Sequence, residues 1–392
     1  MSQPLAGIRV ADFSHVMAGP FASHLLRLMG AEVIKIESRS GDQFRNYGGD
    51  RRYDGMSPAF IAANVGKKSI ALNLKDPEEQ DIARRIVANS DVLIENFRPG
   101  VIARLGFGYE EVKRTNTGIV YCSVSGYGQE GPYRDWPAID NIVQATSGMM
   151  MLSGAEGDPP VRVGFPIVDT LTGQTAALAI LGALVQRQRT GEGAYIDVSM
   201  LDASLAFMTS AVTPFLVTGQ RLKRLGNTGY SGLPTAALFM TRDDRHISLG
   251  VVQENQFVSL ARELGREDWL TDPRFSTPDA RRANFDAMFG ELEEVFRTRD
   301  AHEWEADLSR AGIPCGKIRH VSEAAELSGK GAILDIDLKD YPGGRQVSVP
   351  NAGFRMEPGA PGTTEAPPYL DEDRKEILAW LASLDGHGKS GE

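Results

Sequence analysis

The best candidate for a chemically reactive side chain is the carboxylate of Asp169, in the segment PPVRVGFPIVDTLTG. It directly follows the apolar run 164–168 and precedes a long, alanine-rich stretch with helical periodicity. Aspartate is common at helix N-caps, where its carboxylate accepts backbone N–H bonds. The same carboxylate, exposed to a ligand at the start of a helix, could act as a nucleophile or a base. The spacing leaves both interpretations open.

Four basic residues follow apolar, strand-like runs. Arg98 and Arg104 lie in IENFRPGVIARLGFGYEEV, beside a Pro-Gly turn, while Lys75 ends SIALNLK and Arg39 follows IKIES. Arginine binds phosphate as a two-pronged fork, and open α/β sheets take ligands at the carboxyl ends of their strands. Each cation alone is typical of a solvated surface. Together the four predict an anion site.

Short β-rich runs alternate with helical patterns along the first 125 residues, which predicts an α/β fold with a largely parallel, doubly wound sheet. The predicted strands are residues 8–13, 32–37, 69–74, 92–95, 119–124 and 194–199. The predicted helices include 20–29, one from Pro77, one near Tyr109, and one from Asp169 to about 188. Asp76 before Pro77 and Gly19 before Pro20 are typical of helix starts.

The pattern changes after a polar, glycine-rich stretch at 224–234. A hairpin-like pair, 235–240 and 246–251, leads into predicted helices at 253–264, 281–297 and 300–311 and a strand at 315–318. We therefore predict a Rossmann-like large domain at 1–200, completed by about 340–392, a linker at 201–223, a smaller α+β domain at 224–322 and a return linker at 323–339.

Composition argues against several classes of partner. The net charge of −10 is unlike a nucleic-acid-binding surface, which clusters Lys and Arg. No apolar run reaches the roughly 20 residues of a membrane span, and the first residues lack the pattern of a secretion signal. The two cysteines, Cys122 and Cys315, lie in apolar runs, which is typical of a reducing compartment. We expect a cytoplasmic protein that binds neither nucleic acid nor membrane.

The usual metal and cofactor fingerprints are missing from the sequence. The six histidines show no HExxH pattern and no Cys/His pairing at ligand spacing. No GxGxxG follows the first predicted strand, and neither a Walker loop nor GxSxG occurs. We therefore predict no metal site, and the α/β layers must serve another ligand.

Several segments resemble the family III CoA transferases, the formyl-CoA and carnitine CoA transferase group: DFSHVMAGPFASHLLRLMGAEVIKIE, NVGKKSIALNLKDPEE, VLIENFRPGVIARLGFGYEEV, SGYGQEGPYRD and the Asp169 segment. DPRFSTPDARRAN and AGIPCGKIRHVSEA are similar to the family's small domain, so the likeness runs in order along nearly the whole chain. It implies a ring-shaped subunit threaded through an identical partner in an interlocked homodimer. CoA would lie against the large domain, with no cofactor beyond this substrate.

The resemblance also implies roles for particular residues. Asp169 matches the family's catalytic aspartate, although a helix N-cap and a nucleophile can be the same residue. Positions that line the CoA site are matched by His15, Met17, Leu72, Lys75, Asn96, Phe97, Arg98 and Arg104. His15, taken without the resemblance, is equally typical of a buried core histidine. The nearest candidate for the family's glycine-rich cover loop is GNTGYSGLP, 226–234, with Gly229 and Gly232 as its expected mobile residues.

Four positions depart from the formyl-CoA transferases, which have glutamine at Met17, arginine at Ser38, lysine at Pro137 and tyrosine at Ile139. These differences argue against formyl-CoA or oxalate as a substrate. Arg39, one place after Ser38, can take over the missing charge.

The implied reaction moves CoA from a succinyl-CoA-like donor to a carboxylic acid, through mixed anhydrides and an aspartyl-CoA thioester on Asp169. A carboxyl group with an ordinary pKa of about 4 is ionised at neutral pH, so we expect Asp169 to be ready to attack. We also expect backbone amides near Asp169 to stabilise the oxyanions.

Two other functions remain open at this point. The 2-methylacyl-CoA racemases share the fold and carry a proton-transferring histidine just before an aspartate, in the segment matching Ala138-Ile139-Asp140. Isoleucine at that position cannot transfer a proton. A CoA-binding protein without catalysis would need no Asp169.

Overall fold

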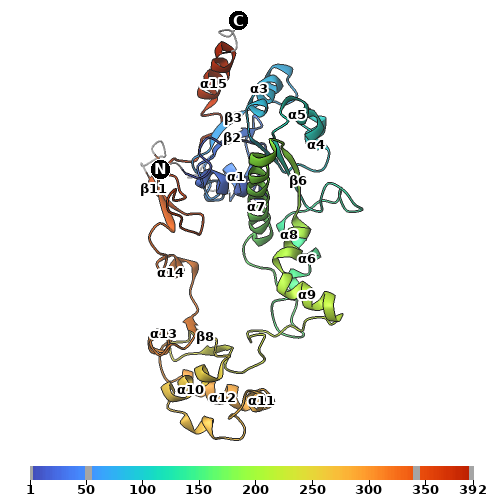
Figure 1. Ribbon diagram of the computed structural model, residues 1–392. Coiled ribbons are helices and arrows are strands. Elements are labelled where there is room, and N and C mark those ends of the chain that lie inside the picture. The colour runs from blue at the N-terminus through green and yellow to red at the C-terminus, as the bar shows by residue number, and fades with distance from the viewer. Residues whose placement is uncertain (1–2, 49–54, 339–344, 388–392) are drawn as a thin grey trace. The chain divides into compact units, whose positions relative to one another are not determined.

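The computed structural model describes residues 3–48, 55–338 and 345–387, and the chain divides into two compact units (Figure 1). Unit 1 comprises Met1–Met149, Arg162–Gly219 and Gly329–Glu392, and unit 2 comprises Met150–Val161 and Gln220–Ser328.

Unit 1 is built on a six-stranded parallel sheet with the order β3-β2-β1-β4-β5-β6. Its strands are β1 (Arg9–Asp12), β2 (Glu32–Glu37), β3 (Lys68–Ala71), β4 (Val92–Glu95), β5 (Val120–Ser125) and β6 (Ala194–Ser199). The predicted parallel, doubly wound sheet is confirmed. The order reverses between β1 and β4, and sheets of this kind bind ligands outside the carboxyl ends of the strands at that point.

Helices cover both faces of this sheet because successive strand residues point to opposite sides. Val10 packs with α1 (Ala18–Leu28) and α7 (Ile167–Thr190), while the next residue, Ala11, faces the opposite core. That second core contains side chains of α3 (Pro77–Ala88), α5 (Tyr109–Thr115) and α15 (Arg374–His387). Figure 1 shows α1 and α7 together beside the sheet. Buried apolar side chains therefore hold the sheet from both sides.

The helix starts follow the predicted signals only in part. Asp76 caps α3 as predicted, since its carboxylate accepts the N–H groups of Glu78 and Glu79. The predicted start at Gly19-Pro20 is wrong by two residues, because α1 begins at Ala18 and Met17 occupies its N-cap position.

The segment predicted as a linker, 201–223, contains most of α8 (Met200–Phe207) and α9 (Thr209–Thr218), and unit 1 extends to Gly219. These helices pack with α6 (Asp140–Thr146) and the start of α7 around Val143, Val168 and Met200. The first residues of α7 are packed into this hydrophobic cluster and are held in place by it.

Helix α7 has the length and composition of a membrane span, with a mean hydropathy of 1.4 over its most apolar stretch, and α8 with α9 passes the same test only as a pair bent by 82°. Half of the α7 stretch is buried, and Ala176, Ile180 and Leu184 belong to the core of unit 1. Within its unit, α7 packs as a core helix.

Unit 2 holds a three-stranded antiparallel sheet, β7 (Leu238–Met240), β8 (His246–Leu249) and β9 (Cys315–Lys317), in agreement with the predicted hairpin and closing strand. Its helices are α10 (Glu254–Glu263), α11 (Pro278–Ala283), α12 (Phe285–Phe296), α13 (Ala301–Arg310) and α14 (Val321–Ala325). The single helix predicted at 281–297 is wrong. Two helices meet at Asn284, whose amide Nδ2 donates to the carbonyl of Ala280.

Among the elements of unit 1 that were not predicted are the short helices α2 (Pro58–Ile61) and α4 (Val101–Arg104), helices α6 and α9, and the antiparallel pair β10 (Ile333–Leu338) and β11 (Arg345–Pro350). The pair β10–β11 packs with α2 through Ile336, Val349 and Phe60. The segment after 329 therefore returns to unit 1.

Helices α1 and α7 approach each other closely at Gly173, where an added Cβ would lie 2.7 Å from the carbonyl oxygen of Ala18. Substituting Gly173→Ala should lower the free energy of unfolding by about 1 to 3 kcal/mol, because the backbones must separate. Gly182→Ala is the matched control on the same helix, since no atom lies within 4 Å of that added Cβ. The control should be neutral or slightly stabilising in urea unfolding. Equal effects of the two variants would contradict the packing argument.

Candidate functional site

Two cavities open at the carboxyl ends of the unit 1 strands. The first, of about 830 Å³, is lined by residues that follow β1, β2 and β3. The second, of about 670 Å³, is lined by residues that follow β1, β4 and β5 and by the start of α7. His15 and Phe97 line both cavities, and their ring centroids lie 5.2 Å apart. The two cavities therefore adjoin along this pair of rings.

Most of the residues predicted to bind CoA line one cavity or the other. The first cavity is lined by Arg39, Leu72 and Lys75 as well as His15 and Phe97. The second is lined by Met17, Asn96 and Arg98 as well as His15, Phe97 and Asp169. Arg104, the last residue of α4, is exposed and is not among the lining residues of either cavity. The structure brings three of the four predicted cations to the cavity walls.

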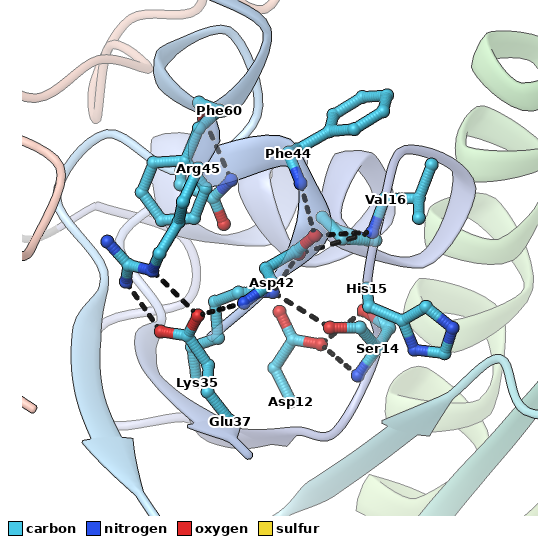
Figure 2. A network of polar contacts seen from close by, with 12 residues as sticks. Asp12, Ser14, His15, Val16, Lys35, Glu37, Asp42, Phe44, Arg45 and Phe60 are labelled. Carbon is cyan, nitrogen blue, oxygen red and sulfur yellow. Dashed lines mark hydrogen bonds and ion pairs between the residues drawn. The ribbon is translucent and has the colours of Figure 1, made fainter. Parts of the chain in front are cut away.

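The loop between β1 and α1 separates the cavities and is held by hydrogen bonds from two other loops. Val16 has a φ of 69°, in the left-handed region that costs a β-branched residue free energy. Its N–H donates to both carboxylate oxygens of Asp42, each at 3.1 Å. The N–H of His15 donates to Asn96 Oδ1 at 2.9 Å, and Asn96 Nδ2 donates back to the carbonyl of His15 at 2.8 Å. Figure 2 shows the Asp42 carboxylate beside Val16, with dashed lines joining the two.

A buried set of ion pairs lies beneath that loop (Figure 2). Lys35 pairs with Asp42 at 2.9 Å and Lys67 pairs with Asp12 at 3.1 Å, and the exposed fraction of all four side chains is 1% or less. Lys35 Nζ also donates to the carbonyl of Ser14 at 2.8 Å. Burial opposes ionisation of Asp12, but Lys67 and Lys35 lower its pKa to about 2. The network therefore stays charged and fixes the loop from below.

His15 lies on this loop and is partly buried. Burial lowers the pKa of its imidazole, although the carboxylates of Asp42 and Asp12 oppose that shift. A histidine with a lowered pKa is neutral at pH 7, so it offers one N–H donor and one nitrogen acceptor to a ligand.

Asp169 is the third residue of α7, and its predicted role as the N-cap is wrong. The helix begins at Ile167, and Pro166 occupies the N-cap position without a side-chain hydrogen bond. Asp140, the first residue of α6, supplies the cap instead: its Oδ2 accepts the N–H groups of Val168 at 2.8 Å and Asp169 at 3.2 Å. The carboxylate of Asp169 receives no hydrogen bond from any residue that the structure describes, and the residue lines the second cavity.

The ionisation of Asp169 also differs from the expectation. Burial and the negative charge of Asp140 raise its pKa to about 7, so the carboxyl group is only partly ionised at neutral pH. The ordinary value assumed from the sequence is wrong because it ignores both effects.

The expected oxyanion donors beside Asp169 are already in use. The N–H of Ile167 donates to Phe165 and that of Thr170 donates to Pro166, and Asp140 takes the two amides between them. These four amides therefore already have acceptors in this structure, and the backbone donors to an oxyanion stay a prediction.

The remaining wall of the second cavity is rich in apolar and aromatic side chains. Met17, Trp136, Pro137 and Ile139 line it, and Ile139 has 64% of its surface exposed. Arg134 lines the same cavity. Three of the four departures noted in the sequence thus face this cavity, while Ser38 lines the first.

The predicted cover loop belongs to unit 2 and precedes β7. The N–H of Gly229 donates to the carbonyl of Ala236 at 2.7 Å, whereas Gly232 has a φ of 64° and no atom within 4 Å of an added Cβ. Both cavities are lined by residues of unit 1. The role of Gly229 and Gly232 as a cover stays a prediction.

Two residues of the site were missed in the sequence. Asp42 begins a 3₁₀ turn in SGDQF, and Asp140 stands directly before a helical pattern, so each carries a weak capping signal. Their partners, Val16 and Val168, lie 26 and 28 residues away along the chain, which no local pattern reveals. Among the residues that the structure describes, no group of three or more His, Cys, Asp or Glu side chains is placed to hold a metal ion.

Comparison with known proteins agrees with this architecture. The model of CoA-transferase family III matches residues 5–374. An acetyl-CoA:oxalate CoA-transferase from Acetobacter aceti is 41% identical over 83% of each chain. A succinyl-CoA:glutarate CoA-transferase from Mus musculus is 33% identical over 98% of this chain and 87% of the relative. A CAIB/BAIF family protein from Brucella suis superimposes with a TM-score of 0.87 and 30% identity over 97% of this chain and all of that structure.

The buried pair Lys35–Asp42 should be a large contributor to stability. Asp42→Asn keeps the side-chain shape but removes the charge, which should lower the free energy of unfolding by about 3 kcal/mol, since breaking a buried pair leaves a charge without its partner. Arg84→Gln is the control because Arg84 and Glu111 form an exposed pair at 3.9 Å, which should contribute less than about 1 kcal/mol. Urea unfolding of both variants measures the difference. A loss at Asp42 no larger than the control's would contradict the role of the network.

Proposed function

The chain belongs to CoA-transferase family III, and from that premise we propose that it moves CoA between two carboxylic acids through a covalent intermediate on Asp169. One observation carries the proposal: the Asp169 carboxylate lines the second cavity, and no described residue donates a hydrogen bond to it. The adjoining first cavity has both basic and acidic side chains in its walls, among them Arg39 and Lys75. A carboxylate that caps no helix and pairs with no cation keeps its lone pairs for a reacting carbonyl.

The chemistry balances without a metal or an external energy source. An Asp169 oxygen attacks the donor's thioester carbonyl, the C–S bond breaks, and CoA thiolate departs. The product on the enzyme is a mixed anhydride of Asp169 and the donor acid. The thiolate then attacks the aspartyl carbonyl, which releases the donor's carboxylate and forms an aspartyl-CoA thioester. The acceptor's carboxylate attacks that thioester and expels CoA thiolate, which gives a second mixed anhydride. The thiolate then attacks the acceptor's carbonyl in this anhydride, which releases the Asp169 carboxylate and forms the new acyl-CoA. The thiolate and carboxylates carry the charge throughout, so no net proton is taken up.

CoA is proposed to lie across both cavities. Arg39 and Lys75 would hold its phosphates in the first cavity, since charge-assisted bonds to phosphate are strong. The pantetheine arm would pass His15 and Phe97 and bring the thioester to Asp169 in the second. The roles of Met17, Leu72, Asn96 and Arg98 belong to the same proposal.

A succinyl-CoA-like donor and a small acid acceptor fit the second cavity. Arg98 and Arg134 supply positive charge there, and Met17 and Ile139 supply an apolar wall, which together suit a short acyl chain with a second carboxylate. The relatives are named for oxalate, glutarate and, in Chloroflexus aurantiacus, D-citramalate as acids, all dicarboxylic.

The 2-methylacyl-CoA racemase stays as the second candidate because His15 and Asp169 line the same cavity. Proton exchange next to the thioester would need two such groups on opposite sides of the substrate. Ile139 stands where the racemases carry their histidine, which favours the transferase.

The interlocked homodimer and the ring-shaped subunit are part of the proposal. Large apolar side chains of unit 1 helices are exposed, with Leu178, Leu216 and Val217 each showing more than 70% of their surface. A partner subunit would cover such residues.

The covalent step is tested by the intact mass of the protein after mixing with succinyl-CoA or acetyl-CoA, with peptide mapping. We expect an acyl or CoA adduct on the Asp169 peptide, no adduct with Asp169→Ala, and at least a roughly 10³-fold loss of transferase turnover in that variant. Glu192→Gln, a change at an exposed carboxylate beyond the end of α7, is the control and should still form the adduct. Absence of any adduct, together with solvent deuterium entering the α-carbon of a 2-methylacyl-CoA, would favour the racemase.

The CoA site is tested by calorimetric binding of CoA to Lys75→Ala. Loss of one charge-assisted bond, of about 1.5 to 3 kcal/mol, should raise the Kd roughly 10-fold or more. Arg84→Ala removes an exposed charge of α3 that lines neither cavity and should leave the Kd unchanged. An unchanged Kd in Lys75→Ala would show that Lys75 is a solvated surface charge that does not bind CoA.

A further inference from the structure

The carboxylate of Asp140 is held by three donors, and its position is therefore well determined. Besides the N–H groups of Val168 and Asp169 on Oδ2, its Oδ1 accepts the side-chain amide of Gln144 at 2.6 Å. Gln144 is fully buried, and its own oxygen accepts the N–H of Val163 at 2.9 Å. Two segments, α6 and the approach to α7, are thus joined through one carboxylate.

This arrangement solves a problem at the start of α7. The first turn of a helix has backbone N–H groups without partners inside the helix, and a side chain just ahead of the helix normally accepts them. Pro166 has no side chain that can do so. Asp140 meets this need from α6, so the start of α7 does not use the carboxylate of Asp169.

Asp140 also places a second negative charge close to Asp169. Burial is the largest cause of the raised pKa of Asp169, and the charge of Asp140 adds to it. The other charged or titratable groups that line the cavity with Asp169 are His15 from the loop after β1, Arg98 from the loop after β4, and Tyr127 and Arg134 after β5. Surroundings that destabilise the anionic form of a carboxylate make its attack on a carbonyl carbon more favourable in free energy.

We propose that Asp140 is a positioning residue for the transfer reaction: it caps α7 in place of Asp169, leaving the Asp169 carboxylate free toward the cavity, and its charge makes that carboxylate a stronger nucleophile. The inference rests on the proposed role of Asp169 as the nucleophile. Asp140 acts through its neighbour and need not touch the substrate.

The test is the rate of adduct formation on Asp169, measured against pH at low acyl-CoA concentration in the full chain. In the wild type the rate should rise with pH through about 7, because only the ionised carboxylate attacks. Asp140→Asn can still accept the two N–H groups but has no charge, so Asp169 should ionise more readily. The midpoint should fall, and the plateau rate should fall as the nucleophile weakens. Asp140→Glu keeps the charge and should restore a midpoint near the wild-type value.

Glu192→Gln is the control for net charge, since Glu192 is exposed beyond the far end of α7. Its midpoint should equal that of the wild type. Circular dichroism establishes that each variant is folded, and Asp140→Ser, a shorter uncharged cap, replaces Asp140→Asn if the latter does not fold.

The outcomes separate the inference from the proposed function. A wild-type enzyme that forms no adduct on Asp169 would overturn the nucleophile itself. An adduct in the wild type, with the same pH midpoint in Asp140→Asn, would leave the nucleophile standing and show that Asp140 only holds the helix, which overturns the inference.

Discussion

The site depends on one constraint: charges removed from water must meet an opposite charge. Lys35 and Lys67 have no exposed surface, and each finds a carboxylate beneath the loop between β1 and α1. The same carboxylate that neutralises Lys35, that of Asp42, accepts the N–H of Val16 in its unfavourable left-handed conformation. A buried ion pair thereby holds in place the loop that separates the two cavities.

Two aspartates of the same unit show how strongly surroundings decide chemistry. Asp12 is fully buried and Asp169 is half-buried, and removal from water alone would raise the pKa of each. Asp12 meets two lysines and its pKa falls to about 2, whereas Asp169 meets only another carboxylate and its pKa rises to about 7. The first is an inert counter-ion, and the second is poised between its protonated and ionised forms. The residue type is the same, and the neighbouring charges make the difference.

Much of unit 1 could be predicted because its information is local. Apolar runs gave the six parallel strands, and basic residues after those strands pointed to the cavity walls at Arg39, Lys75 and Arg98. The prediction failed where a residue acts on a partner far along the chain. No spacing rule shows that Asp140 caps the helix carrying Asp169, so an N-cap stayed open as one interpretation of Asp169. Arg104 is exposed and lines neither cavity, so its role in binding CoA stays a prediction.

The contact of α1 with α7 has a consequence for the site as well as for packing. Helix α1 starts at the cavity loop, and α7 starts at the helix turn that bears Asp169. The two helices meet at Ala18 and Gly173, four residues after Asp169, where the backbones touch because Gly173 has no side chain. Because Gly173 has no side chain, the two helices can pack closely. This close packing sets the distance between Asp169 and the loop that holds His15 and Met17. The distance between a bound thioester and the oxygen that attacks it therefore depends on how closely the two helices pack at Gly173. This residue itself makes no contact with substrate.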